Sequence, residues 1–383
     1  MTIRFFHPEV LQPTELDAFL AAGWFRMRQA VFTCRFVLES GDLHTALWIR
    51  VPLSGYRFKK SLRRVLNRND RLYDVAFGPL VIDEEKEELY QRYRAAFDGD
   101  LAPTLSAALY DEDGTDIFDT WQTEVRLDGR LVAFSIFDQG GASIESIMGV
   151  WDPSLRRHGL GLYTMLLEVR YGRDEGFDLF YPGYVAPGCT AFDYKLRLDG
   201  VEFLDPDGGG WRDIARLESE ALPSTRYREA FDAVEAELDA LDVPFERRLY
   251  PLYRLVAVDE RLTRCLDVPL FVQLHPESES RVMLTLVWDP EEETYSLLAC
   301  IPLADLGEQF RSYAERVAGN GPRPCLELLR PVTRVARSDR AEGIARCVVM
   351  PAQVRRTGHG VGVAPAEPEP APIASIIIGD DEE

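Results

Sequence analysis

Six consecutive residues near the middle of the chain have the composition of a phosphate-binding loop. Residues 156–161 read Arg-Arg-His-Gly-Leu-Gly, and the apolar residues that follow are spaced as on one face of a helix. The first amides of a helix have no partner within it, and the helix dipole adds partial positive charge, so a helix start binds anions. We therefore predict that a phosphate-bearing donor is bound by Arg156, Arg157, His158, Gly159 and Gly161. The alternative is an ordinary turn flanked by solvated arginines.

A basic segment precedes this loop. Residues 56–71 hold seven cations and one acid in a chain whose formal net charge is −21. Three apolar residues are spaced to bury one side of a helix there, which leaves Arg63, Arg64 and Arg68 on its other sides. Such a surface can bind phosphates through its cations. The alternative is a solvated basic face, or one that pairs with the acidic residues 83–88.

The glycine-bearing loop lies between two predicted strands. Residues 143–150 alternate apolar and polar side chains, as a half-buried strand does, and residues 177–181 read as another strand. Gly176 is the expected C-cap of the helix between them. Upstream, residues 120–127 and 131–137 read as strands joined by Asp-Gly, a preferred two-residue hairpin turn. The predicted order is an antiparallel meander followed by strand, loop, helix and strand.

Length and composition indicate a soluble chain of more than one domain. At 383 residues it exceeds one typical domain of ~100–200 residues. No apolar run reaches the ~18 residues of a spanning helix, and the first 13 residues lack the plan of a signal peptide. We expect a cytoplasmic protein. Its six cysteines form no Cys-x-x-Cys pair, so no metal site is expected.

The remaining segments define the expected domain organisation. Strands are expected at 25–38, 45–53, 249–256, 269–274, 282–288 and 294–302. Helices are expected near 14–23, 83–97, 224–241 and 303–318. We predict an α+β protein with an N-terminal α+β unit at 1–80, a domain carrying the glycine-bearing loop at 81–215, a C-terminal α+β module at 220–354 and a disordered acidic tail at 355–383.

Several short motifs follow one another over residues 1 to about 210. They are Gly23-Trp24-Phe25-Arg26, the basic stretch 58–69, Leu89-Tyr90-Gln91-Arg92-Tyr93, Thr120 with Glu124 and Arg126, Trp151-Asp152-Pro153, Leu160-Gly161-Leu162-Tyr163, Tyr181-Pro182-Gly183-Tyr184 and Tyr194-Lys195. In this order they resemble the aminoacyl-tRNA–protein transferases of the N-degron pathway, of the arginyl and bacterial leucyl type. The resemblance implies a GNAT-like acyltransferase domain over residues 81–215.

The same resemblance implies an enzyme that moves an amino acid from aminoacyl-tRNA to the N-terminal amine of a protein. No cofactor is expected, and neither a membrane nor DNA is an expected partner. Arg63, Arg64 and Arg68 would contact the tRNA backbone. Because the donor ester is already activated, positioning, proton removal and oxyanion stabilisation are the main requirements. The expected catalytic residues are Glu124, Tyr181, Tyr184, Tyr194 and Lys195.

The chain departs from that family at two places. Family members carry several cysteines in the amino-terminal region, where this chain has only Cys34, so no iron–sulfur cluster is expected. Ala191-Phe192 stands where the family tends to have Lys-Met, which bears on acceptor specificity. The loop at 156–161 is also close to a CoA-binding loop. An acetyl-CoA-dependent GNAT N-acetyltransferase is therefore one alternative, and a non-catalytic RNA- or protein-binding relative is another.

Overall fold

The computed structural model describes residues 3–97, 99, 101–111, 114–258, 260–276, 280–306, 313 and 317–349, without the side chains of residues 257, 258 and 260. The chain divides into two compact units. Unit 1 comprises residues 1–39 and 43–224, and unit 2 comprises residues 40–42 and 225–383. Within the described ranges, no helix combines the length and hydropathy that a bilayer crossing requires.

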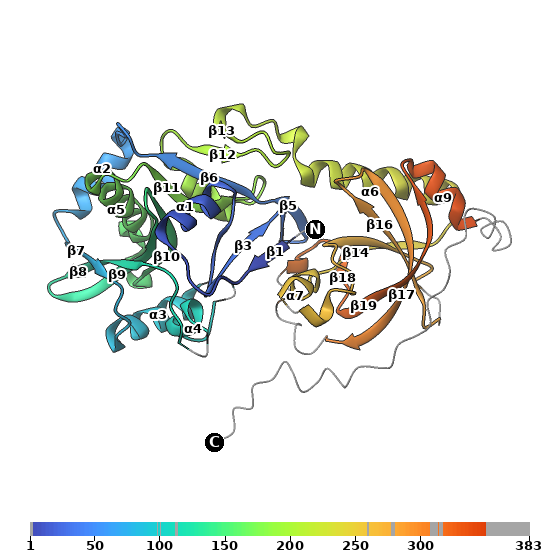
Figure 1. Ribbon diagram of the computed structural model, residues 1–383, viewed down its shortest axis with the longest axis horizontal. Helices are drawn as coiled ribbons and strands as arrows, with labels where there is room; N and C mark the ends of the chain where they lie inside the picture. Colours follow the sequence, from blue (N-terminus) through green and yellow to red (C-terminus); the bar gives the residue numbers. More distant parts are fainter. Residues whose placement is uncertain are drawn as a thin grey trace, which may run out of the picture. The chain divides into compact units, whose positions relative to one another are not determined.

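Unit 1 is built around an eight-stranded sheet in the order β13-β12-β6-β11-β10-β9-β8-β7 (Figure 1). Its strands are β6 (Leu47–Pro52), β7 (Asp74–Pro79), β8 (Thr120–Leu127), β9 (Arg130–Gln139), β10 (Ser143–Trp151), β11 (Leu179–Val185), β12 (Glu202–Leu204) and β13 (Trp211–Asp213). Strands β8 to β10 form the predicted antiparallel meander, and β7, which was not predicted, extends it by one strand. Strands on both sides of residue 80 share this sheet. The domain boundaries drawn from the sequence stay a prediction.

One parallel pair interrupts the antiparallel pattern. Strand β10 leads through the 3₁₀ helix η1 (Pro153–His158) and α5 (Leu160–Glu175) back to β11, which pairs with it in parallel. Gly176 adopts φ +85° at the end of α5, as predicted for its C-cap. Asp128 and Gly129 both have positive φ in the β8–β9 turn, as a two-residue hairpin requires. The predicted order of meander, strand, loop, helix and strand is therefore confirmed.

Helices cover both faces of this sheet. On one face α5 and α2 (Lys60–Asn69) share a core that includes Leu62, Leu166 and Phe180. On the other face α3 (Glu84–Ala96) and α4 (Leu105–Leu109) share a second core that includes Leu89 and Phe134. The central strands are therefore buried on both sides. The basic helix and the acidic helix predicted from periodicity both form.

The predicted strand over 25–38 is wrong. The structure divides it into β2 (Phe25–Met27), β3 (Ala30–Cys34) and β4 (Phe36–Glu39). Arg28 has φ +55°, and its carbonyl accepts a hydrogen bond from the Arg26 Nε at 2.7 Å, which fixes a turn between β2 and β3. Strand β1 (Ile3–Phe6) completes a small sheet with them, β4 pairs with β5 (Asp42–Thr45), and α1 (Pro13–Ala21) is the predicted first helix.

Unit 2 is an α+β unit with a six-stranded sheet in the order β18-β14-β15-β16-β17-β19. Its strands are β14 (Phe245–Leu249), β15 (Leu270–Leu274), β16 (Met283–Asp289), β17 (Thr294–Asp305), β18 (Arg323–Pro324) and β19 (Glu327–Ser338), and its helices are α6 (Pro223–Ala240), α7 (Tyr253–Val258) and α9 (Ala341–Val349). The strands predicted at 282–288 and 294–302 are confirmed as β16 and β17, which pair as a hairpin. The predicted strand over 249–256 is wrong, because β14 ends at Leu249 and α7 begins at Tyr253. Most of the predicted helix over 303–318 and all of the predicted tail lie outside the described residues.

Candidate active site

The start of α5 has the geometry of an anion site. Gly159 is its N-cap and has φ +65° and ψ +42°, a left-handed conformation that glycine adopts at little cost. In the part of the chain that the structure describes, no side chain caps this helix end. The first amides of α5 are therefore available to an external anion. Substitution at Gly161 would meet the Trp151 indole, whose Nε1 lies 3.0 Å from the position of a Cβ atom.

The basic helix α2 is joined to this helix start. The guanidinium of Arg68 donates a hydrogen bond to the His158 carbonyl, and Asn69 Nδ2 donates to the same oxygen at 3.1 Å. The Tyr73 hydroxyl lies 2.5 Å from His158 Nδ1. These contacts bring one predicted tRNA-binding residue, Arg68, to the predicted donor-phosphate site. They connect segments about ninety residues apart in the sequence.

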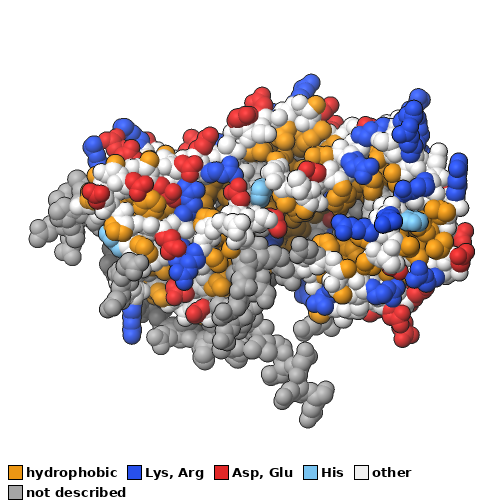
Figure 2. Space-filling model, turned by 180° about the vertical axis from the view of Figure 1, so that it is seen from behind, with side chains coloured by type: hydrophobic (Ala, Val, Ile, Leu, Met, Phe, Trp, Pro, Cys, Tyr) orange, Lys and Arg blue, Asp and Glu red, His pale blue; other side chains and the backbone are white. Residues whose placement is uncertain are grey.

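The other predicted phosphate ligands are exposed. They are Arg63, Arg64, Arg156 and Arg157. Within the described ranges none of the four forms an ion pair, although many arginines elsewhere in this acidic chain do. Figure 2 shows Lys and Arg side chains gathered at the upper right of that face, where the region of α2 lies after the half-turn from Figure 1. Their charge is therefore available to an external polyanion.

Strands β10 and β11 separate toward their carboxyl ends. Their parallel pairing runs only from Ser143 opposite Leu179 to Glu145 opposite Tyr181, although β10 continues to Trp151. The same end of the sheet is covered by η2 (Thr190–Arg197). Helix α5 follows β10 in the chain, so the amino terminus of α5 lies near the carboxyl end of β10, where the two strands separate. The amides at the start of α5 and the predicted catalytic side chains of β11 and η2 therefore lie at one end of this parallel pair.

Two predicted catalytic residues meet at the end of β11. Lys195 Nζ donates to the Tyr184 carbonyl at 2.9 Å and lies 5.6 Å from the centre of the Tyr184 ring. Removal from water lowers the pKa of Lys195 to about 8. A fraction of this amine is therefore neutral near physiological pH.

Tyr194 lies where the two strands part. This residue is 44% exposed. Desolvation is the main cause that raises the pKa of Tyr194, and the nearby Tyr93 on α3 and Glu168 on α5 raise it further through their charge. Helices α3 and α5 lie on opposite faces of the sheet. A side chain that reaches groups on both must lie at the end of the sheet, where β10 and β11 have separated.

Tyr181 and Tyr184 border one aromatic cluster on the face opposite α5. The rings of Phe25 and Trp48 stack with centres 4.0 Å apart. Tyr181 packs edge-on against Phe25 at 6.0 Å, and Tyr184 packs edge-on against Trp48 at 5.2 Å. The Tyr181 hydroxyl is buried and has no hydrogen-bond partner among the described residues. Burial raises the pKa of Tyr181, so this phenol stays protonated and can donate.

Glu124 requires a correction. Its Oε1 lies 2.7 Å from Lys86 Nζ, its Oε2 lies 3.0 Å from an Arg126 nitrogen, and its side chain faces α3. Tyr181 is on β11, three strands away, which is about 14 Å at the usual strand spacing. These two predicted catalytic residues therefore do not meet at one site. Burial alone would raise the pKa of Glu124, but hydrogen bonds and charge from Lys86 and Arg126 outweigh burial and lower it.

Sequence reasoning missed two buried carboxylates near the parting strands. Glu145 on β10 is 2% exposed and accepts from the Arg26 amide at 2.7 Å. Glu168 on α5 is fully buried. A signal for Glu168 was present, because Leu160, Thr164 and Glu168 follow at intervals of four and therefore share one helix face. The prediction of this helix considers only apolar residues on its buried face, and such a pattern does not find a buried glutamate.

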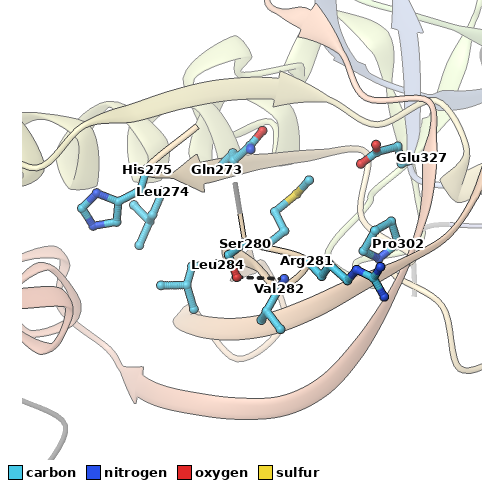
Figure 3. Close-up of a pocket in the computed structure, with 10 residues that line it drawn as sticks. Gln273, Leu274, His275, Ser280, Arg281, Val282, Leu284, Pro302 and Glu327 are labelled. Atoms are coloured by element: carbon cyan, nitrogen blue, oxygen red, sulfur yellow. Dashed lines mark hydrogen bonds between the residues drawn. The ribbon is translucent and has the colours of Figure 1, made fainter. Parts of the chain in front are cut away.

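Unit 2 contains a cavity of about 600 Å³, shown in Figure 3. Its lining mixes the apolar Leu274 and Pro302 with the charged Arg281 and Glu327. We assign it no role in catalysis.

The sheet of unit 1, with its β10–α5–β11 unit and glycine-led helix start, has the GNAT-like α+β arrangement predicted for an acyltransferase. Residues 85–205 match the protein-family model described as "Arginine-tRNA-protein transferase, C terminus". The resemblance to the aminoacyl-tRNA–protein transferase family predicted from the sequence is thereby confirmed.

Individual relatives agree with this match. The chain is 29% identical over 235 residues to an aspartate/glutamate leucyltransferase of Ruegeria pomeroyi, covering 60% of this chain and 82% of the relative. It is 26% identical over 204 residues to one of Leptospira interrogans, covering 52% and 77%. Both alignments cover most of the relative's own length.

Solved structures give weaker matches. A domain of a lysylphosphatidylglycerol synthetase from Agrobacterium fabrum has 16% identity and a TM-score of 0.31, covering 37% of this chain and 46% of its own. A GCN5-related N-acetyltransferase from Kribbella flavida has 20% identity and a TM-score of 0.24, covering 41% and 54%. At these scores the fold assignment depends on the topology of unit 1 itself.

Proposed function

We propose that this protein transfers an amino acid from aminoacyl-tRNA to the N-terminal amine of an acceptor protein. The family match and the leucyltransferase relatives support an aminoacyltransferase of this class. The names of those relatives suggest leucine as the amino acid and an N-terminal aspartate or glutamate as the acceptor. A donor and an acceptor of this kind point to the cytoplasm as the compartment of the reaction.

The observation that carries the proposal is the junction of α2 with the start of α5. A small acyl donor needs only the helix-start amides, whereas a tRNA also presents a run of backbone phosphates. The contact of Arg68 with the His158 carbonyl joins an exposed basic helix to those amides. One surface therefore offers a site for the terminal phosphates and cations for the adjoining backbone. An acetyl-CoA enzyme has no need of the second part.

The chemistry follows from the groups at the parting strands. The acceptor amine attacks the ester carbonyl carbon, the bond to the ribose oxygen breaks, and the amine loses a proton as the amide forms. The ribose oxygen takes up a proton as it leaves. Tyr184, Tyr194 and Lys195 supply donors for the oxyanion and a partly neutral amine. The ester is already activated, so the reaction as proposed needs no cofactor.

The test compares ligands on the purified protein. Thermal unfolding is followed with leucyl-tRNA, arginyl-tRNA, uncharged tRNA, acetyl-CoA and CoA, because a ligand that binds only the folded state raises its stability. Transfer of labelled leucine or arginine to peptides beginning with Asp, Glu or Ala is then measured. We expect stabilisation by charged tRNA and transfer to acidic N-termini. Stabilisation by acetyl-CoA alone would establish the N-acetyltransferase alternative, and tRNA binding without transfer would establish a non-catalytic relative.

A further inference from the structure

A set of buried polar atoms without partners lies beneath α5. Both carboxyl oxygens of Glu168 are buried, and no described residue gives either of them a hydrogen bond. The hydroxyls of Ser135 and Thr123 are also buried without a partner among the described residues. The Ser135 and Ser146 hydroxyls face the Glu168 carboxyl closely enough to lower its pKa as hydrogen-bond donors, against the larger opposite effect of burial, although neither completes a hydrogen bond of full geometry. We call Glu168, Ser135, Ser146 and Thr123 the Glu168 cluster.

Strand register places the whole cluster on the sheet face that α5 covers. Thr123 is opposite Ser135 on β8 and β9, and Ser135 is opposite Gly149 on β10. A Cβ atom on Gly149 would lie 3.1 Å from Thr164 Oγ1 of α5, so this row of residues points at the helix. Ser146 is opposite Phe137, a member of the core shared with α5. The strands beneath Glu168 therefore contribute hydroxyls to the cluster.

This arrangement costs stability. A buried polar group without a well-formed hydrogen bond is unfavourable, and more so when it is charged. Among the described residues no cation faces Glu168. Apolar side chains of similar size would be more stable here. The cluster offers a carboxyl group and neighbouring hydroxyl oxygens that can accept hydrogen bonds. Its complementary ligand is therefore a cation with several N–H donors, such as a primary ammonium group.

The place of the cluster relative to the helix start identifies the ligand. Glu168 is eight residues into α5 from Leu160, which is about 12 Å along the helix axis. Ser146 is the first residue of β10 beyond its paired segment, and Tyr194, which is 44% exposed, is close enough to Glu168 for the two groups to interact electrostatically. A nucleoside carrying a 3′ aminoacyl ester has a comparable length from phosphate to amine.

We infer that the Glu168 cluster binds the α-ammonium group of the aminoacyl donor while the amides at the start of α5 bind its terminal phosphate. This inference rests on the proposed function and assigns the residues that distinguish an α-amino acyl group from other acyl groups. Titration agrees with it. Burial raises the pKa of Glu168 to about 8, near that of an α-amine at about 7.7–8.0, so the pair can share one proton. The titratable groups that face it are Tyr194 of η2 and, beyond it, Tyr93 of α3.

The test uses two probes that cannot transfer. One is adenosine 5′-phosphate with leucine or arginine joined to its 3′ position through an amide, and the other is the same molecule acetylated on the α-amine. Binding to the full-length protein is measured by calorimetry. Because a hydrogen bond to a charged group is worth about 1.5–3 kcal/mol, we expect the free-amine probe to bind at least about 10-fold more tightly. Glu168→Gln should remove this preference, and Ser135→Ala should reduce it.

Glu175→Gln is the matched control, because Glu175 is an exposed carboxylate on the same helix. It should keep the preference. Equal binding of both probes by the wild-type protein, with charged tRNA still bound, overturns this inference and leaves the proposed function standing. Failure of the wild-type protein to bind either probe or charged tRNA overturns both. The comparison within the wild-type protein decides the matter even if a variant does not fold.

Discussion

The guanidinium of Arg68 at the end of α2 donates a hydrogen bond to the backbone carbonyl of His158, the residue before the N-cap of α5. Asn69 donates to the same carbonyl at 3.1 Å. A cationic helix is thereby fixed beside free helix-start amides. These contacts bring the two predicted binding elements onto one surface.

Removal of the α2 charges should weaken tRNA binding. We expect Arg63→Ala/Arg64→Ala/Arg68→Ala to bind all tRNA sequences less tightly and to reduce the salt dependence by about one unit of slope for each duplex phosphate that is no longer bound. Binding across a salt series measures both. Arg334→Ala/Arg337→Ala/Arg340→Ala removes three exposed arginines of unit 2 as the control. Unchanged affinity and slope in the α2 variant would reject tRNA binding by α2.

Substitution at Gly159 should abolish donor binding while leaving the fold. A side chain there costs about 1–2 kcal/mol in the left-handed region and obstructs the approach of a phosphate to the amides. Gly176→Val is the matched control, since Gly176 has φ +85° at the other end of α5 with no atom within 4 Å of a Cβ. Both variants should lose similar stability in denaturant titrations. If the Gly159→Val protein is folded and binds its donor normally, the loop is an ordinary turn without a role in donor binding.

Glu124 should prove structural. Glu124→Gln leaves Lys86, which is 1% exposed, with only Asp83 at 3.0 Å, so we expect a loss of about 3 kcal/mol in unfolding free energy. Because the pKa of Glu124 is lowered by folding, this contribution is present above the usual carboxyl pKa of about 4.3 and disappears as pH falls below it. Glu88→Gln, in an exposed pair at 4.0 Å, should cost little. If a folded Glu124→Gln protein no longer transfers the amino acid, Glu124 has a catalytic role after all.

The buried ammonium group of Lys195 should lower the free energy of unfolding at neutral pH. Folding lowers the pKa of Lys195 to about 8, so the charged amine is unfavourable in the folded state below that pH, and the penalty fades between pH 8 and about 10.4. Lys195→Met should therefore be more stable by about 1–2 kcal/mol at pH 7, allowing for partial exposure and for removal of the hydrogen bond to Tyr184. Denaturant titrations at pH 7 and pH 10 test this. A constant difference between the two pH values would contradict it.

Limited proteolysis tests the boundary between the two units. Residues 1–39 and 43–224 form one compact unit, so we expect a stable fragment that ends near residues 210–225. Mass spectrometry of a time course identifies its ends. Cleavage that yields no such fragment, or one that ends near residue 80, would contradict this division.

The sequence determined the local features of the site. The glycine at 159, the helix after it, the Asp-Gly hairpin and the basic amphipathic helix each depend on neighbours within a few residues, so spacing was sufficient to predict them. The order of the short motifs can also be read along the chain, and it indicated the resemblance to the transferase family. The strand predicted over 25–38 failed because its turn depends partly on a side-chain contact of Arg26.

Tertiary structure decided which charges remain for function. Lys86 and Glu124 are 38 positions apart, and their pairing on neighbouring elements holds the Glu124 carboxylate in an ion pair, away from the other predicted catalytic residues. Glu168 is buried because α5 packs on the strands beneath it, and Arg68 reaches the predicted phosphate site through a contact with a residue ninety positions away. Burial and ion pairing depend on which distant segments meet, and residue spacing along one segment carries no information about that.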